Sequence, residues 1–306
     1  MPDPTELVLT GGFAAALGIA AFSALWRLML AGKARPVGFG CGMTVAAESP
    51  YVPPREVALP PALPSGKVGV WFYRPWDLVG VAMIFLVFAL LVLESAHVAE
   101  GGSSVFGAGT LIVNIGFQAF MVGAVAVSVV RRVGWTTWLG LQWPGWPWVF
   151  LIAPAAVVFM WVVFAGLKLS GYIKWMESFG VETVQDTVKL LQKSEDPLIL
   201  GLMTVAAVIA APLCEEIVFR GYFYPVLKKY AGVWPAAACA ALVFAAAHGN
   251  LTALLPLFIF GGLLIFVYEK TGSLWAPIAV HCCFNSATVL AQFAVRWFHI
   301  PLDTAP

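Results

Sequence analysis

"LILGLMTVAAVIAAPLCEEIVFR" occupies residues 198–220 and decides how the chain must fold. Residues 198–211 carry no charge, as expected for part of a membrane-spanning helix, which needs about 20 apolar residues. Glu215, Glu216 and Arg220 then follow inside the same continuous pattern. A charge at the bilayer centre costs about 2.5–3.5 kcal/mol on insertion scales, so such groups usually pair with one another or line a wet cavity. The stretch therefore predicts a membrane helix that carries a functional site.

The composition of the whole chain agrees with a membrane helix at this position. Of the 306 residues, 61% are hydrophobic and 11% are charged, whereas a soluble domain carries about 25% charged residues. We therefore expect an integral membrane protein of the all-α class, a polytopic helical bundle. The net charge of +1 gives no reason to expect nucleic acid as a partner. The five cysteines form no CxxC pair, which argues against a thiolate zinc site or a redox motif.

Eight apolar segments have the character of spanning helices, and the first is Leu7–Trp26. The others lie at about 78–97, 109–130, 147–170, 198–226, 233–248, 253–268 and 274–297. They divide the chain into a first transmembrane helix (1–32), a proline-rich cytoplasmic loop (33–77), accessory transmembrane helices and loops (78–197), a membrane core that carries the charged stretch (198–297) and a short tail (298–306).

The lysines and arginines near the span ends predict the orientation, because cytoplasmic loops carry an excess of these residues. If the spans simply alternate, most of them fall on one side, including Arg131, Arg132, Lys228, Lys229 and Lys270. The opposite loop at 98–108 has none. We therefore expect both termini outside, and the short loops suit a bacterial inner membrane.

Polar side chains recur in two later spans at a similar depth. His248 ends one span, and His281 and Asn285 lie within the last. Counted from the basic face at 1.5 Å per residue, Glu215 lies about 20 Å deep, His248 about 22 Å and His281 about 16 Å. Taken singly, a glutamate–arginine pair could simply clamp two helices, and a lone intramembrane histidine is more often than not a packing or hydrogen-bonding residue. Three segments that place polar groups in one layer favour a shared site.

Spacing along the helix separates the two glutamates. Residues four apart share a helix face, so Arg220 can neutralise Glu216, while Glu215 points about 100° away from Glu216. His281 and Asn285 form a second such pair. Pro212 has no N–H to give to the carbonyl of Val208, so we expect a kink or a widened turn just before the glutamates.

These residue types suit hydrolysis by an activated water. A glutamate without a local partner is a candidate general base, and His248 can share a water with it. His281 and the Asn285 amide can donate hydrogen bonds to a developing oxyanion. Two glutamates and two histidines can also bind zinc, although the HExxH pattern is absent. Spacing alone leaves the choice between carboxylate and metal open.

Three motifs resemble one known family. "EEIVFR" at 215–220 matches EExxxR, "FAAAH" at 244–248 matches FxxxH, and "HCCFN" at 281–285 matches HxxxN. In that order they resemble the CPBP family, which comprises type II CAAX prenyl proteases and bacteriocin-processing or self-immunity proteins. The resemblance covers about 198–297, a third of the chain.

The resemblance implies an intramembrane endopeptidase whose active site opens into a cavity within a helical bundle. Its partners would be a membrane-associated protein or peptide substrate and the lipid bilayer. The implied roles are catalytic carboxylate and water-sharing histidine for Glu215 and His248, oxyanion donors for His281 and Asn285, and supporting residues for Glu216 and Arg220.

Three alternatives stay open. Family members have been described both as metalloproteases and as metal-free glutamate proteases; we favour no cofactor, with zinc on Glu215, His248 and His281 as the alternative. A non-catalytic immunity or scaffold protein would bind a partner in the same cavity. A transporter would use the buried carboxylate as a proton site, although the chain shows no internal repeat.

Overall fold

The computed structural model describes residues 11–16, 18–19, 21–23, 66–99, 107–179 and 186–298. Within these ranges every regular element is helical. The all-α class is therefore confirmed for the described part of the chain. Parts of the predicted first span, the proline-rich loop up to residue 65 and the tail beyond residue 298 lie outside the described residues.

The helices follow the apolar segments of the sequence closely. In chain order they are α2 (Asp77–Ala99), α3 (Ala108–Leu139), η1 (Trp146–Trp148), α4 (Val149–Leu169), α5 (Tyr172–Glu177), α6 (Asp186–Lys193), α7 (Pro197–Val205), η2 (Ala206–Ala210), α8 (Ala211–Glu215), η3 (Glu216–Phe223), α9 (Tyr224–Ala231), α10 (Val233–Ala246), α11 (Leu251–Thr271) and α12 (Trp275–Trp297). The elements from α7 to α9 form one uninterrupted helix of 35 residues, Pro197–Ala231, which we call the long helix.

Within the described ranges five helices are long and apolar enough to cross a membrane: α3, η1 with α4, the long helix, α11 and α12. Shorter apolar helices occur at Gly11–Ser23, Asp77–Val92 and Val233–Ala246. Together they make the protein an integral membrane helical bundle, with the count of eight spans still a prediction.

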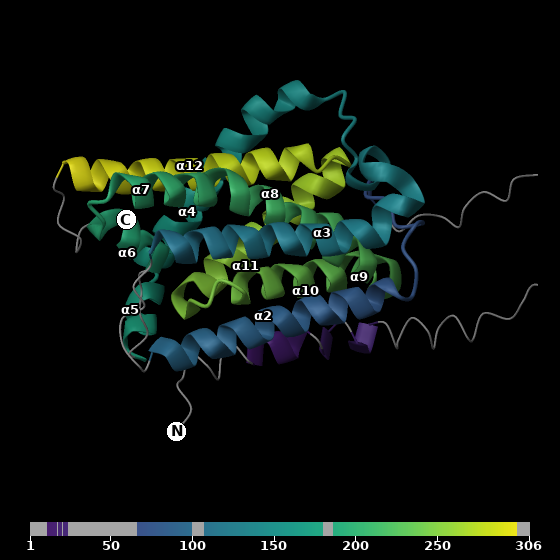
Figure 1. Ribbon diagram of the computed structural model, residues 1–306, viewed down its shortest axis with the longest axis horizontal. Coiled ribbons are helices and arrows are strands. Elements are labelled where there is room, and N and C mark those ends of the chain that lie inside the picture. The colour runs from purple at the N-terminus through teal and green to yellow at the C-terminus, as the bar shows by residue number, and fades with distance from the viewer. Residues whose placement is uncertain are drawn as a thin grey trace, which may run out of the picture.

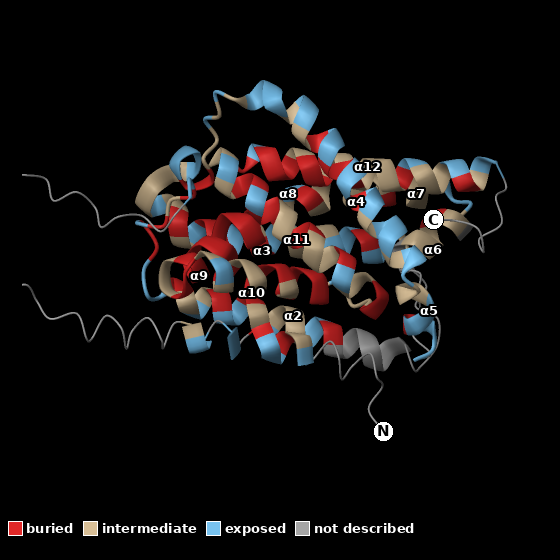
Figure 2. Ribbon diagram, turned by 180° about the vertical axis from the view of Figure 1, so that it is seen from behind, coloured by how far each residue is buried: buried red, intermediate tan, exposed pale blue. Residues whose placement is uncertain are grey.

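The helices run mostly along one axis, as Figure 1 shows. In that view α7 and α8 of the long helix lie between α12 and α3, whereas α9 lies below α3 beside α10. α10 packs along α11, and α4 packs along α12. Figure 2 shows that the buried residues concentrate in α9, α10 and α11, while α4 and α5 expose much of their surface. Such exposure of apolar side chains is expected where lipid is the solvent.

Aromatic side chains gather at both ends of the bundle. At the end where α3 finishes and α10 and α12 begin, exposed tryptophans include Trp76, Trp135, Trp148, Trp234 and Trp275. At the other end Trp175, Phe179, Trp297 and Phe298 are exposed. Tryptophan is enriched at the two membrane–water interfaces, so these two belts mark where headgroups meet the protein.

Buried ion pairs tie the basic end of the bundle together. The Arg132 guanidinium donates hydrogen bonds to both carboxylate oxygens of Asp77, each at 2.7 Å. Lys228, expected from its charge to flank a span, is instead fully buried, with its ammonium 2.5 Å from Glu269. A lysine in that position needs an acceptor because an unpaired buried charge is very costly.

Candidate active site

The long helix widens on both sides of Glu215. The segments η2 and η3 are π-helical, so an N–H there bonds to the carbonyl five residues earlier; that of Ala211 donates to Ala206. The widened turn expected just before the glutamates is therefore present. The second, Glu216–Phe223, is not suggested by any residue in the sequence.

Pro212 frees a different carbonyl from the one expected. In an α-helical register it would leave the Val208 carbonyl without a donor, but in the π register of η2 the affected carbonyl is that of Ala207. The side chain of Asn285 donates from Nδ2 to this carbonyl at 2.8 Å. Asn285 thus joins α12 to the long helix eight residues before Glu215, and its amide has a second N–H that this bond does not use.

Glu216 lies at the centre of a buried network. Its Oε1 accepts from Nη1 of Arg220 at 2.8 Å, as the i,i+4 spacing predicts, and from Nδ1 of His281 at 2.8 Å. All three side chains are less than 5% exposed. The carboxylate paired with a guanidinium can only accept, so the His281 proton must be on Nδ1. Nε2 of a neutral His281 is then an acceptor.

Glu215 faces that acceptor. Its Oε2 lies 4.0 Å from Nε2 of His281 and has no hydrogen-bond partner among the described residues. Its side chain is 21% exposed, in contrast to the completely buried Glu216. The two neighbouring glutamates therefore differ in the way the sequence predicts, one paired and one free.

His248 joins the site through Phe244. Nδ1 of His248 lies 2.8 Å from the Phe244 carbonyl, so this nitrogen also carries its proton and Nε2 is left as an acceptor. The fully buried ring of Phe244 packs edgewise against both imidazoles, at 4.9 Å from His248 and 5.9 Å from His281. Arg220 lies over the same ring at 4.2 Å. His248 itself follows the end of α10 and is exposed.

The arrangement can polarise a water molecule. Two acceptors 4.0 Å apart, Oε2 of Glu215 and Nε2 of His281, are spaced so that one water at about 2.8 Å could donate to both. A water held in this way directs its lone pairs away from the two acceptors. It is thereby prepared to attack an electrophile.

The residues that could hold a metal are those of the zinc alternative, Glu215, His248 and His281. Among the described residues no three His, Cys, Asp or Glu side chains are grouped as a metal site requires. The described part of the chain therefore shows no preassembled set of zinc ligands, and metal dependence stays a prediction for experiment.

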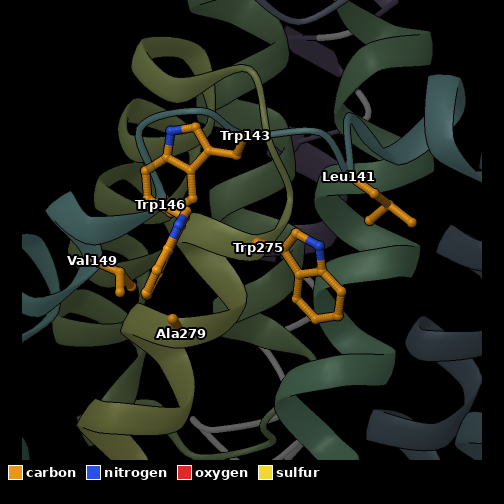
Figure 3. Close-up of a pocket in the computed structure, with 6 residues that line it drawn as sticks. All are labelled: Leu141, Trp143, Trp146, Val149, Trp275 and Ala279. Carbon is orange, nitrogen blue, oxygen red and sulfur yellow. The ribbon is translucent and has the colours of Figure 1, made fainter.

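A separate cavity of about 400 Å³ lies at the basic end of the bundle, with no titratable residue in its lining. Figure 3 shows Trp143, Trp146, Val149 and Ala279 on one side, with Trp275 and Leu141 nearby. Ala279 lies two residues before His281 on α12 and so points about 200° away from it. The cavity is therefore not part of the carboxylate–imidazole site.

The fold and these side chains together define a class: an integral membrane helical protein with a buried carboxylate–imidazole site. Residues 197–287 match the sequence model of the Rce1-like family, the type II CAAX prenyl endopeptidases. The resemblance drawn from the three motifs is confirmed for this segment, which contains all seven residues that define the motifs. It is 30% of the chain, so the match says nothing of the helices before it.

A curated relative supports the same assignment. The same length of chain, 91 residues, is 30% identical to "Putative membrane peptidase YdiL" of Bacillus subtilis (strain 168). The aligned part covers 37% of that protein, so the chain spans well under half of its relative's length. No solved structure matches the chain significantly.

Proposed function

We propose that this protein is an intramembrane endopeptidase that hydrolyses a peptide bond of a membrane-associated substrate. The observation that carries the proposal is the unpartnered Oε2 of Glu215, held 4.0 Å from Nε2 of His281, beside a second carboxylate whose Oε1 is bonded to Arg220 and His281. A base, a place for water and a rigid support are what hydrolysis without a covalent intermediate requires.

In the proposed reaction Glu215 takes a proton from the water as the oxygen attacks the carbonyl carbon. His248 shares this water, as the motifs suggest, and His281 lies close enough to do so as well. The same proton then passes to the leaving nitrogen, and the C–N bond breaks. The spare Asn285 N–H would donate to the oxyanion of the tetrahedral intermediate. His281 would do so too where its Nε2 has taken a proton from solvent before the attack, in which case Nε2 donates to the oxyanion and does not accept from the water.

Glu216 and Arg220 support these groups without contacting the substrate. A carboxylate on Nδ1 fixes the tautomer and the ring orientation of His281, and it stabilises an imidazolium when one forms. The guanidinium forms an ion pair with that carboxylate and lies over the ring of Phe244. The supporting roles implied by the motif resemblance thus have a physical basis.

We further propose that the protein resides in a bacterial inner membrane with both termini outside. The basic residues in the C-terminal part of α3 (Arg131 and Arg132) and in the last turns of α9 and α11 favour this orientation, because they lie toward one end of the bundle. The exposed tryptophans of the same end support an interface there. The substrate would then reach the site from within or alongside the bilayer.

The test compares wild-type protein with Glu215→Gln and Glu177→Gln. Each is reconstituted into liposomes with detergent-extracted membrane proteins, and new N-termini are quantified by mass spectrometry. We expect cleavage to disappear in Glu215→Gln and to persist in Glu177→Gln, whose carboxylate is exposed on α5. Undiminished cleavage in a folded Glu215→Gln variant would refute the proposal. A biological effect that survives this change would instead indicate a binding protein.

A further inference from the structure

The carbonyl of Gly221 is bonded in an unusual way. It belongs to η3, directly after Arg220, near the point where the π-helical register ends and α9 begins. An α-helical bond from this carbonyl would need the N–H of residue 225, which is a proline and has none. Two side chains from distant parts of the chain supply donors instead. The Tyr73 hydroxyl donates at 2.5 Å and the Trp138 indole N–H at 2.7 Å, and both side chains are 2% exposed.

Trp138 reaches this carbonyl because α3 bends. Gly134 has φ 70° and ψ 161°, which interrupts the helix and redirects its last turn. The next residue, Leu139, accepts from the backbone N–H of Leu274 at 3.0 Å, immediately before α12 begins. Residues 138 and 139 therefore contact both the helix that carries Glu216 and the helix that carries His281.

Tyr73 is held just as firmly. It lies in the segment 66–76 that precedes α2, and the backbone of this segment bonds to three helices. The amide of Lys67 donates to Glu269 of α11 at 3.2 Å, and the Phe72 carbonyl accepts from Arg132 of α3 at 3.0 Å. The ammonium of Lys229 in α9 bonds to the carbonyl of Tyr73 itself. These backbone bonds therefore position the Tyr73 phenol independently of its own hydrogen bond to Gly221.

We propose that Tyr73, Trp138 and Leu139 form a brace that sets the geometry of the candidate active site, so that Tyr73 and Trp138 are positioning residues for its chemistry. The brace fixes the rotation of η3 through Gly221 and the start of α12 through Leu274. The 2.8 Å bond between Glu216 and His281 spans these same two helices. Its length therefore depends on how the brace holds them.

The proposal extends the site into a part of the chain that the family match does not cover. Tyr73 and Trp138 lie before residue 197, where the match begins. Leu139 also packs closely against Gly221, because a Cβ at position 221 would lie 3.0 Å from the Leu139 side chain. Because burial raises the pKa of Tyr73 well above its ordinary value, the phenol keeps its donor proton across the physiological range.

The test uses Tyr73→Phe, Trp138→Phe and their double variant, and it rests in part on the proposed function. The matched controls are Tyr230→Phe, whose hydroxyl meets no hydrogen-bond partner among the described residues, and Trp135→Phe, which loses an exposed indole packed against Trp138. Thermal unfolding of each purified variant identifies any that fail to fold.

Two measurements follow on the folded variants. The first is the ¹⁵N spectrum of histidine-labelled protein, with His281 assigned by its loss in His281→Gln, because imidazole nitrogen shifts report which nitrogen carries the proton. We expect a single Nδ1–H tautomer in wild type and controls, and a mixture in the double variant. The second is cleavage of the substrate whose processing depends most strongly on Glu215.

A misplacement of about 1 Å can cost about 100-fold in rate. We therefore expect kcat to fall about 100-fold in the double variant and about ten-fold in Trp138→Phe, with KM nearly unchanged. His281 signals in the double variant that coincide with those of wild type would overturn the proposal. Altered His281 signals in a protein whose wild type cleaves nothing would uphold the brace and refute the proposed function.

Discussion

Replacing Arg220 with methionine tests whether Glu216 and Arg220 form a buried ion pair. The two side chains are 1% and 0% exposed, and their charged atoms lie 2.8 Å apart. Methionine fills similar space without charge, so the carboxylate keeps only His281 as a partner. Removing one member of a buried ion pair costs about 3–5 kcal/mol. We expect Arg220→Met to lower the free energy of unfolding by about that amount.

The double variant Glu216→Leu/Arg220→Met tests whether the instability of Arg220→Met comes from an unpaired charge. Replacing both charges with apolar groups is often neutral, and the remaining cost is the lost acceptor for Nδ1 of His281, about 1–3 kcal/mol. The double variant should therefore be more stable than Arg220→Met alone, by about 2 kcal/mol. If the second substitution restores stability, the Arg220→Met variant had left a buried charge unpaired.

The measurement is equilibrium unfolding in mixed micelles with increasing dodecyl sulfate, followed by tryptophan fluorescence. The control is Arg131→Met, which removes an exposed arginine and should change the free energy by less than about 0.5 kcal/mol. If Arg220→Met behaves like this control, or if the double variant is the least stable of all, Glu216 is not a buried ion and the reasoning fails.

Three further predictions concern the neighbouring groups. Asn285→Ala should cost about 1–3 kcal/mol in the same unfolding assay, because the carbonyl of Ala207 loses its donor, and adding Pro212→Ala should reduce that cost by returning an N–H to the helix. The stability difference between wild type and Tyr73→Phe should hold steady at neutral pH. It should shrink above about pH 10, because the unfolded phenol then ionises while the buried one, with its raised pKa, resists. Finally, if Glu215 activates water without metal, cleavage in liposomes should survive prolonged chelation; activity that disappears and returns on adding zinc would instead favour the metal-dependent alternative.

Local geometry could be predicted from the sequence because helix periodicity alone determines it. The Glu216–Arg220 pair and the free neighbour Glu215 both follow from residues per turn, and the described helices follow the apolar segments. Counting residues from the basic face also placed Glu215 and His281 in one layer, and they lie 4.0 Å apart. Depth, however, does not say which histidine faces which glutamate, and the bond from His281 to Glu216 depends on how α12 rotates.

The contacts that the sequence could not give depend on long-range packing. The π-helical register of η2 shifts the carbonyl freed by Pro212 from Val208 to Ala207. Pro212 predicts a kink or a widened turn, but no residue type predicts this particular register. Tyr73 and Trp138 lie 148 and 83 residues from Gly221 along the chain. The presence of Pro225 four residues after Gly221 was the available signal, since a carbonyl freed in a buried helix must find another donor.

The tryptophans at the two ends of α12 give the proposed catalytic layer a position in the bilayer. Trp275 and Trp297 are both exposed and are separated by a rise of about 33 Å, close to the thickness of the hydrocarbon core. His281 lies six residues beyond Trp275, about 9 Å beneath the level of the indoles. Scission at this depth would take place just under the headgroups, where water penetrates readily. A polypeptide that only dips into the membrane surface would then suffice as a substrate, with no need for a helix that crosses it.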